Sequence, residues 1–399
     1  MIKEKLNILI AIESFFDGGA EMFAIRLANE LALTQKVYFI EVYPYLSKEK
    51  RQFSLLDTKR IMVIQAGQNF IGDWLYINGR TRNGGNNIKS KVEPLYQFFK
   101  KLQVKLFIKK NKITIVNSHS WDSDVFFAML KKEVKFNLVA SLHGHYEFLA
   151  NKRKNFIPIT KATLNVVDTV IYTSPEQQQT LDRNFCKLTK RRKVFYGVSM
   201  SLERIIKKNY QSGTCLELVM VARGIKEKGW EEAILAVLQV LKKFPGLVKL
   251  TLVGEGEFLD YLKIKYNSPA ISFLGYQNDV FDIVCSSHIG LLPTYYIAES
   301  LPNSIIEYLF CAKPVITTNV GAITDMISLN EQIAGVSINL NDGMVDIGTI
   351  TDAIENYICN PLLVEKHAEI AIRAAEKFTM KGCIEKYLAA YSDLPHVIN

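Results

Sequence analysis

Short apolar runs alternate with helical periods along nearly the whole chain of 399 residues, and this alternation restricts the fold more than any other feature. Such alternation is typical of α/β proteins, in which parallel strands are covered by helices. The first half has seven predicted strands, at residues 6–12, 37–43, 61–64, 113–117, 137–142, 169–172 and 194–196. The second half has six, at residues 216–221, 248–253, 271–274, 289–292, 315–318 and 336–338.

A polar stretch, residues 199–214, separates the two sets of strands. With 48% hydrophobic residues, the chain can bury two cores of ordinary size. We therefore expect two doubly wound, Rossmann-like domains, residues 1–198 and 199–378, that face each other across a cleft. Ligands should bind outside the carboxyl ends of the strands. The Gly/Asn-rich residues 77–87 are expected to form a mobile loop.

Cysteine usage and hydropathy exclude several classes of protein. The six cysteines are scattered singly, with no C-x-x-C and no metal-ligand spacing, so we expect reduced thiols in a cytoplasmic protein without a metal site. The apolar run near the N-terminus is short and lacks a small-residue cleavage site, which favours a first buried strand over a signal peptide. No segment approaches the ~20 apolar residues that a membrane-spanning helix needs.

Charge is unevenly distributed between the two halves. Residues 1–200 carry 32 Lys and Arg against 17 Asp and Glu, a net +15, whereas residues 201–399 carry 17 against 23, a net −6. A basic half suggests an anionic partner, such as the inner face of a membrane that the protein contacts peripherally, or an acidic polymer. An evenly solvated basic surface is the alternative. Nucleic acid is not expected, because no recognition motif accompanies the charge.

Two carboxylates, Glu299 and Glu307, stand on either side of a predicted helix start. Pro302 suits the first turn of that helix, where its missing N–H is not needed, and Ser300 or Asn303 could cap it. The helix should run to about Ala312, before a buried strand. Its first free amides, at residues 303–305, would then point out of a helix N-terminus and form an anion site.

This segment, with the Lys-Pro-Val-Ile strand that follows, resembles the E-x7-E signature of family 4 glycosyltransferases of the GT-B fold. The family pattern runs roughly E-G-[LF]-[PG]-N-x-x-x-E-A-x-A-x-G-x-P-V-I. Here Ser300 replaces the first Gly, Tyr308 the Ala after the second Glu, and Ala312 the later Gly. The resemblance implies that Glu299 holds the C3 hydroxyl of the donor sugar and that Glu307 accepts hydrogen bonds from ribose hydroxyls. It places the diphosphate at the helix start, beside Pro302, Asn303, Ser304 and Ile305.

Three other segments of the second half fit the same family. Arg223 and Lys228 follow the first strand, as in the family's G-R-x-x-x-x-K-G segment, and the resemblance implies that these cations neutralise the leaving diphosphate. Gly254 matches the V-G-x-G turn after the next strand. Tyr276 follows a strand whose end lies near the nucleobase in family members. A surface turn is the alternative reading of each.

Paired glycines, Gly18 and Gly19, join the first predicted strand to a helix, and they let the backbone approach a phosphate or sugar closely. They resemble the family's G-G-x-E loop. G-x-G-x-x-G is absent, which argues against a nicotinamide enzyme. His119 also follows a strand, and the resemblance implies that it lies against the donor sugar. His143-Gly144 resembles the T-x-H-G turn that shapes an acceptor pocket.

The resemblance to family 4 implies a retaining glycosyltransferase, of the hexosyltransferase class, that needs no cofactor. The resemblance implies that a nucleotide-diphosphate sugar, with UDP favoured, binds the second domain. A glycan or lipid-linked glycan acceptor of cell-surface polysaccharide or glycolipid synthesis would bind the first. A divalent metal should be dispensable, and residues 379–399 should return to the first domain. A nucleotide-sugar epimerase and a catalytically silent nucleotide-sugar-binding protein remain as alternatives.

Overall fold

The structure is a computed structural model that describes residues 5–16, 18–46, 51–67, 87–143, 156–185, 190–198, 208–296, 299 and 301–397. The chain divides into two compact units. Unit 1 comprises Met1–Thr173, Gln177–Val198 and Met380–Asn399, and unit 2 comprises Ser174–Glu176 and Ser199–Thr379. The expected loop at residues 77–87 lies outside the described residues, apart from Asn87, which begins a helix.

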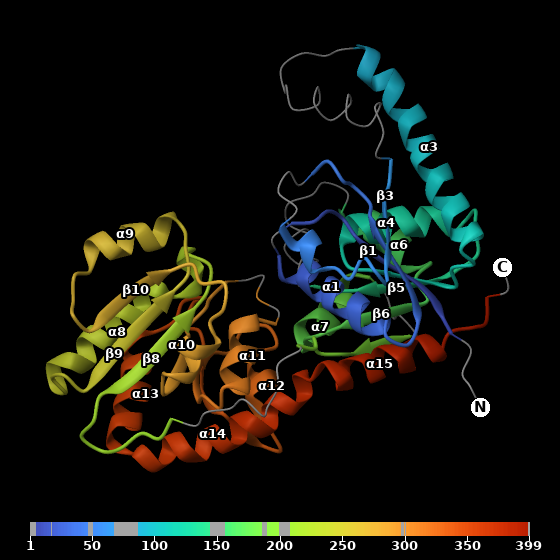
Figure 1. Ribbon diagram of the computed structural model, residues 1–399. Helices are drawn as coiled ribbons and strands as arrows, with labels where there is room; N and C mark the ends of the chain where they lie inside the picture. Colours follow the sequence, from blue (N-terminus) through green and yellow to red (C-terminus); the bar gives the residue numbers. More distant parts are fainter. Residues whose placement is uncertain are drawn as a thin grey trace. The chain divides into compact units, whose positions relative to one another are not determined.

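Unit 1 contains a parallel seven-stranded sheet in the order β3-β2-β1-β4-β5-β6-β7 (Figure 1). The central strands are buried apolar runs, since helices pack on both faces. The strands are β1 (Asn7–Ile12), β2 (Lys36–Glu41), β3 (Met62–Gln65), β4 (Ile115–Ser118), β5 (Asn137–Ser141), β6 (Thr169–Tyr172) and β7 (Arg191–Lys193). Its helices are α1 (Gly19–Leu31), α3 (Asn87–Lys110), α4 (Trp121–Leu130), α6 (Phe156–Leu164), α7 (Pro175–Asn184) and α15 (Met380–Ser392), with a 3-10 turn η1 (Arg51–Leu55).

The last helix, α15, belongs to unit 1 although it follows the whole of unit 2 in the sequence. Tyr387 and Tyr391 are buried, and the Tyr391 hydroxyl accepts a hydrogen bond from Asn117 Nδ2 at 2.7 Å. The Tyr387 hydroxyl lies 3.2 Å from Ser141 Oγ. Both bonds reach the carboxyl ends of β4 and β5, so α15 is tied to the centre of the first sheet.

Unit 2 contains a parallel six-stranded sheet in the order β10-β9-β8-β11-β12-β15. Its strands are β8 (Leu216–Val221), β9 (Val248–Val253), β10 (Ile271–Gly275), β11 (Ile289–Leu292), β12 (Val315–Thr318) and β15 (Gly335–Ile338), beside a hairpin of β13 (Ser328–Leu329) and β14 (Gln332–Ile333). Its helices are α8 (Trp230–Lys243), α9 (Glu257–Lys265), α10 (Phe281–Cys285), α11 (Asn303–Phe310), α12 (Ile323–Ile327), α13 (Ile347–Cys359) and α14 (Pro361–Ala375), with 3-10 turns η3 (Lys226–Lys228) and η4 (Glu376–Phe378).

The two parallel α/β sheets confirm the predicted fold class. One strand was predicted wrongly: the last strand of unit 1 is β7, Arg191–Lys193, and not residues 194–196. β7 is an edge strand that pairs with β6 alone among the described strands, and its basic side chains are largely exposed, so it has no apolar signature. No helix in the described part of the chain combines the length and the apolar character needed to cross a bilayer.

Candidate functional site

In unit 2, the loops at the carboxyl ends of β8, β9 and β11 are packed against one another. A Cβ on Gly254 would lie 2.0 Å from the carbonyl oxygen of Ala222, and one on Gly229 would lie 2.1 Å from that of Pro293. Gly229 also has a φ of 83°, which favours glycine. Glycine is therefore required at both positions, and the close packing gives this edge of the sheet a fixed shape.

Lys228 and Glu299 meet at this edge and form an ion pair whose side chains are only 8% and 9% exposed. The hydroxyl of Thr294 lies 3.3 Å from the same Glu299 oxygen and 3.2 Å from the carbonyl oxygen of Glu227. The backbone amide of Tyr295 also donates to the Glu227 carbonyl, at 2.8 Å. The loop after β11 is therefore held on the η3 turn, and residues 71 positions apart in the sequence become direct partners.

The second predicted cation, Arg223, lies near the same place but is exposed. Its carbonyl oxygen accepts a hydrogen bond from the Trp230 indole at 2.9 Å, which fixes its backbone. The Tyr296 ring stands close to both cations, 5.7 Å from the Arg223 guanidinium carbon and 5.1 Å from Lys228 Nζ. Tyr296 was not predicted as a site residue, because an aromatic residue in a loop carries no signal until its neighbours in space are known.

Helix α11 begins as expected, with one correction to its cap. Pro302 occupies the N-cap position, without a side-chain cap, and Asn303 is the first helical residue. The Ile305 amide donates to the Pro302 carbonyl at 3.2 Å, so it is not one of the free amides of the helix start. The amides of Asn303 and Ser304 remain at the predicted anion site. Glu307 is half-buried on this helix.

Tyr276 follows β10, the edge strand that lies beyond β9 from β8 and β11, and 61% of its surface is exposed. It follows Gly275, whose φ is 69° and whose carbonyl oxygen accepts a hydrogen bond from the Gly254 amide at 3.0 Å. An exposed aromatic ring at the carboxyl end of a parallel sheet can stack on a flat ligand such as a nucleobase.

In unit 1, His119 and His143 come together although they were predicted for different roles. His119 Nδ1 lies 2.9 Å from His143 Nε2, and His143 Nδ1 is hydrogen-bonded to the Tyr196 hydroxyl. His119 is 2% exposed, and its Nε2 has no hydrogen-bond partner within the described residues. Burial lowers the pKa of His119 to about 3, so its imidazole is neutral at neutral pH. Gly144 lies outside the described residues.

The glycine pair stands at the start of α1. Gly18 is the N-cap residue, and a Cβ on it would lie 2.3 Å from a carboxylate oxygen of Glu21. Gly19 is the first helical residue. Nearby, the buried Glu41 accepts hydrogen bonds from Ser14 Oγ at 2.8 Å and from the Phe15 amide at 3.2 Å. The loop between β1 and α1 is thereby anchored to the end of β2.

Comparison with known proteins identifies the family of the chain. Residues 17–196 match the family described as Glycosyltransferase Family 4, and residues 216–359 match the family described as Glycosyl transferases group 1. The chain is a family 4 glycosyltransferase of the GT-B fold. Curated protein sequences gave no match.

Solved structures show the same fold as this glycosyltransferase over nearly its whole length. Sucrose-phosphate synthase from Thermosynechococcus elongatus has a TM-score of 0.70 at 18% identity, over 97% of this chain and 98% of its own. The Anabaena protein HepE in complex with UDP has a TM-score of 0.72 at 15% identity, over 98% and 100%. The lipopolysaccharide outer core galactosyltransferase WaaB has a TM-score of 0.71 at 14% identity, over 98% of this chain and 100% of its own.

The glycosyltransferase departs from the family pattern at Tyr308, and the structure explains how the larger residue is accommodated. A Cβ on Gly290 of β11 would lie 2.3 Å from the Tyr308 ring, so this glycine makes room for it. The Tyr308 hydroxyl accepts a hydrogen bond from the Val221 amide at 2.8 Å and lies 3.3 Å from the Leu291 carbonyl oxygen. Tyr308 therefore ties α11 to the carboxyl ends of β8 and β11.

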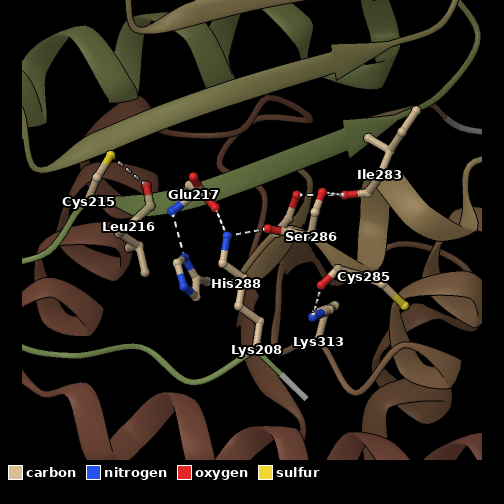
Figure 2. A network of polar contacts seen from close by, with 10 residues as sticks. Lys208, Cys215, Leu216, Glu217, Ile283, Cys285, Ser286, His288 and Lys313 are labelled. Atoms are coloured by element: carbon tan, nitrogen blue, oxygen red, sulfur yellow. Dashed lines mark hydrogen bonds and ion pairs between the residues drawn. The ribbon is translucent and has the colours of Figure 1, made fainter. Parts of the chain in front are cut away.

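A second polar network of the glycosyltransferase lies at the amino ends of the strands of the same sheet (Figure 2). Lys208 is bonded to the Glu217 carboxylate and to the Ser286 carbonyl oxygen, and the Glu217 amide donates to His288 Nδ1 at 3.0 Å. Burial lowers the pKa of His288 to about 4, as a ring nitrogen that accepts a hydrogen bond requires. Because these groups stand at the amino ends of β8 and β11, we assign them to the structure of unit 2.

No group of three or more His, Cys, Asp or Glu side chains in the described residues is arranged to hold a metal ion. The cation that pairs with Glu299 is Lys228, and the Arg223 guanidinium lies near the Tyr296 ring.

Proposed function

We propose that the protein is a retaining glycosyltransferase that moves a sugar from a UDP-sugar to a glycan or lipid-linked glycan, in cell-surface polysaccharide or glycolipid synthesis. The observation that carries the proposal is the buried Lys228–Glu299 pair. A buried ion pair loses much of its Coulombic gain to desolvation, so it adds little to stability. Its value lies in a cation and a carboxylate held in place before a ligand arrives.

Each group has a role in transfer. Lys228, Arg223 and the amides of Asn303 and Ser304 accept the charge that grows on the leaving diphosphate, and preorganised donors of this kind contribute a few kcal/mol each. Glu299 holds the sugar's C3 hydroxyl, Glu307 the ribose hydroxyls, and Tyr276 the base. Pro302 and Ile305 shape the helix start.

The acceptor hydroxyl attacks the anomeric carbon from the face that the diphosphate leaves. The bond from that carbon to the diphosphate oxygen breaks, the new glycosidic bond forms, and the hydroxyl proton passes to the departing diphosphate. No side-chain nucleophile and no metal ion is required. His119, neutral and with its Nε2 unpaired among the described residues, binds a sugar hydroxyl, and His143 and Gly144 contribute to the acceptor site.

Two structures of similar fold support the choice of substrates. The Anabaena protein was solved with UDP-glucose, which favours a UDP-sugar here. WaaB is a lipopolysaccharide outer core galactosyltransferase, which supports a lipid-linked glycan as acceptor. Such an acceptor, together with the net +15 of residues 1–200, favours a cytoplasmic enzyme in peripheral contact with an anionic membrane.

The test is a panel of nucleotide sugars and acceptors, with product configuration read by NMR. Lys228→Met should lower turnover by ~10²-fold or more, whereas the control Lys226→Met, at an exposed lysine of the same turn, should leave it unchanged. Removing one member of a buried pair can unfold a protein, so the double variant Lys228→Met/Glu299→Met is included. It should recover stability but not transfer.

Three outcomes would overturn parts of the proposal. Wild-type turnover in a folded Lys228→Met variant would remove the diphosphate assignment. An inverted product would exclude retention. Isomerisation of the donor without any acceptor would make the protein an epimerase.

A further inference from the structure

Helix α3 carries a strip of large apolar side chains on its outward face. Five residues, each between 36% and 59% exposed, recur at helical spacing: Leu95, Phe98, Phe99, Leu102 and Leu106. At 100° per residue they fall within an arc of about 100°. Single exposed apolar residues are ordinary, but a continuous strip along three turns marks an interaction surface.

The opposite face of α3 is already used for packing. Val104 and Ile108 belong to the hydrophobic core of unit 1, and Lys100 is buried with its Nζ 3.6 Å from the centre of the Tyr43 ring. Gln103 Oε1 accepts a hydrogen bond from the Gly67 amide at 2.8 Å, just after β3. The helix is therefore fixed to unit 1 by its inward face, and its N-terminal part extends away from the sheet (Figure 1).

Lysines accompany the strip. Helix α3 contains seven Lys and a single Glu, and Lys109 and Lys110 are exposed at its C-terminal end. Lys105 pairs with Glu133 at 3.0 Å. Elsewhere in unit 1 several basic side chains are neutralised by acidic partners: Lys131 by Asp168, Arg191 by Asp182 and Arg192 by Asp393. Among the described residues, the exposed Lys109 and Lys110 have no acidic partner, so the C-terminal end of α3 carries uncompensated positive charge.

We propose that the outward face of α3 docks on an anionic lipid bilayer, with Leu95, Phe98, Phe99, Leu102 and Leu106 in the headgroup and acyl boundary and the exposed lysines, Lys109 and Lys110, among the lipid phosphates. An apolar face bordered by Lys is the pattern of a helix that lies in a membrane interface. This assignment names the surface that makes the peripheral membrane contact of the proposed function. It rests on that membrane contact, but it requires neither the nucleotide-sugar donor nor the transfer chemistry.

A second copy of the chain fits this face less well. Two copies paired through the same strip would bring the lysines of both helices together, and like charges at close range oppose association. An anionic surface complements the same lysines. Charge complementarity therefore selects a bilayer over a dimer.

The test is sedimentation of the full chain with vesicles of phosphatidylcholine alone and of phosphatidylcholine mixed with phosphatidylglycerol. Wild-type protein should bind the mixed vesicles, and added salt should weaken binding as it screens the lysines. Phe98→Ser/Phe99→Ser should weaken binding about tenfold or more, because two large apolar side chains no longer enter the interface. The control Ile264→Ser/Leu362→Ser, at two exposed apolar residues of unit 2, should not weaken it.

Insertion is measured separately with Phe98→Trp, whose fluorescence should shift to shorter wavelength with mixed vesicles and be quenched by brominated acyl chains, whereas Ile264→Trp should show neither change. Equal binding of wild type and Phe98→Ser/Phe99→Ser would overturn the proposal. The proposal would also be overturned if the wild type bound no vesicles and formed a dimer that Phe98→Ser/Phe99→Ser dissociates. Sugar transfer from a UDP-sugar to a soluble glycan acceptor, in place of a lipid-linked one, is measured in the same proteins. Its survival in Phe98→Ser/Phe99→Ser separates loss of docking from failure of the proposed enzymatic function.

Discussion

Ala312 is a single residue at which this chain departs from the glycine of the family pattern, and its backbone shows the consequence. Its φ is 56°, in the left-handed region. The Lys313 amide bonds to the Tyr308 carbonyl at 2.8 Å, and the Ala312 amide bonds to that of Leu309 at 3.0 Å. These two bonds form a Schellman motif at the end of α11, in which the residue at Ala312 is usually glycine.

We therefore predict that Ala312→Gly stabilises the protein. The left-handed conformation costs an alanine about 1–2 kcal/mol, which exceeds the entropy that glycine adds to the unfolded chain, so a net gain of about 0.5–1 kcal/mol is expected. Urea unfolding measures it. The control Ala32→Gly, at a helix end where φ is −66°, should destabilise. A loss of stability in Ala312→Gly would show that the methyl group contributes packing worth more than the strain.

The sequence predicted the residue types of the site but not their partnerships. Glu299 and Lys228 were each recognised from a local motif, whereas their ion pair depends on how the loop after β11 folds over the η3 turn. His119 and His143 were assigned to different functions, yet they share a hydrogen bond. Tyr296 was missed altogether. Contacts between loops depend on sheet order and loop geometry, which no local pattern contains.

At the scale of elements, the buried strands were predictable because they lie inside both sheets and must be apolar. β6, β8, β9, β11 and β12 have the bounds that their apolar runs indicated. β7 was misplaced because the bounds of an edge strand are set by its pairing with one neighbouring strand and leave no run of buried apolar residues in the sequence. The hairpin of β13 and β14 was not predicted, since strands of two residues leave no periodicity to detect.

The amino ends of β8, β11 and β12 carry the network of Figure 2, whose most buried cation is Lys313. Its Nζ donates to the Cys285 carbonyl oxygen at 2.8 Å. Burial lowers the pKa of Lys313 from 10.5 to about 8, with Lys208 adding to the effect and the thiols of Cys285 and Cys311 opposing it. A buried ammonium with a carbonyl as its partner costs stability while it is charged.

This cost should depend on pH with a definite sign. The unfolded chain keeps the Lys313 proton up to about pH 10.5 and the folded chain only to about pH 8, so unfolding takes up a proton between these values. The contribution of Lys313 to stability therefore rises from pH 8 to pH 10.5, and its cost is complete below pH 8.

Lys313→Met removes this dependence, together with the hydrogen bond from Lys313 to Cys285. The stability of the variant minus that of the wild type should thus fall as pH rises from about 8 to about 10. Urea unfolding at several pH values, read at the transition of unit 2, measures the difference. A difference that stays constant, or that grows with pH, would show that Lys313 keeps its proton in the folded protein.

At the scale of the whole molecule, the chain builds two sheets with separate cores, and its last helix completes the first of them. The composition of α15 does not indicate which unit the helix packs on, because α15 has the amphipathic character of any surface helix. Its destination is decided by particular contacts: Tyr387 and Tyr391 reach Ser141 and Asn117 in the centre of the first sheet. Loss of Tyr387 and Tyr391 should therefore lower the stability of unit 1.

A chain that ends at Thr379 tests this division together with the proposed place of the nucleotide. Without α15, the buried side chains beneath it meet water and Asn117 Nδ2 loses its acceptor, so the unfolding transition of unit 1 should fall by more than ~10 °C or disappear. The transition of unit 2 should remain. UDP should raise that transition in the truncated and the full chain alike, because a ligand stabilises the unit that binds it. Calorimetry with and without UDP resolves the two transitions. If truncation lowered both transitions equally, the units would not unfold separately; if it abolished the UDP shift, nucleotide binding would require residues of unit 1.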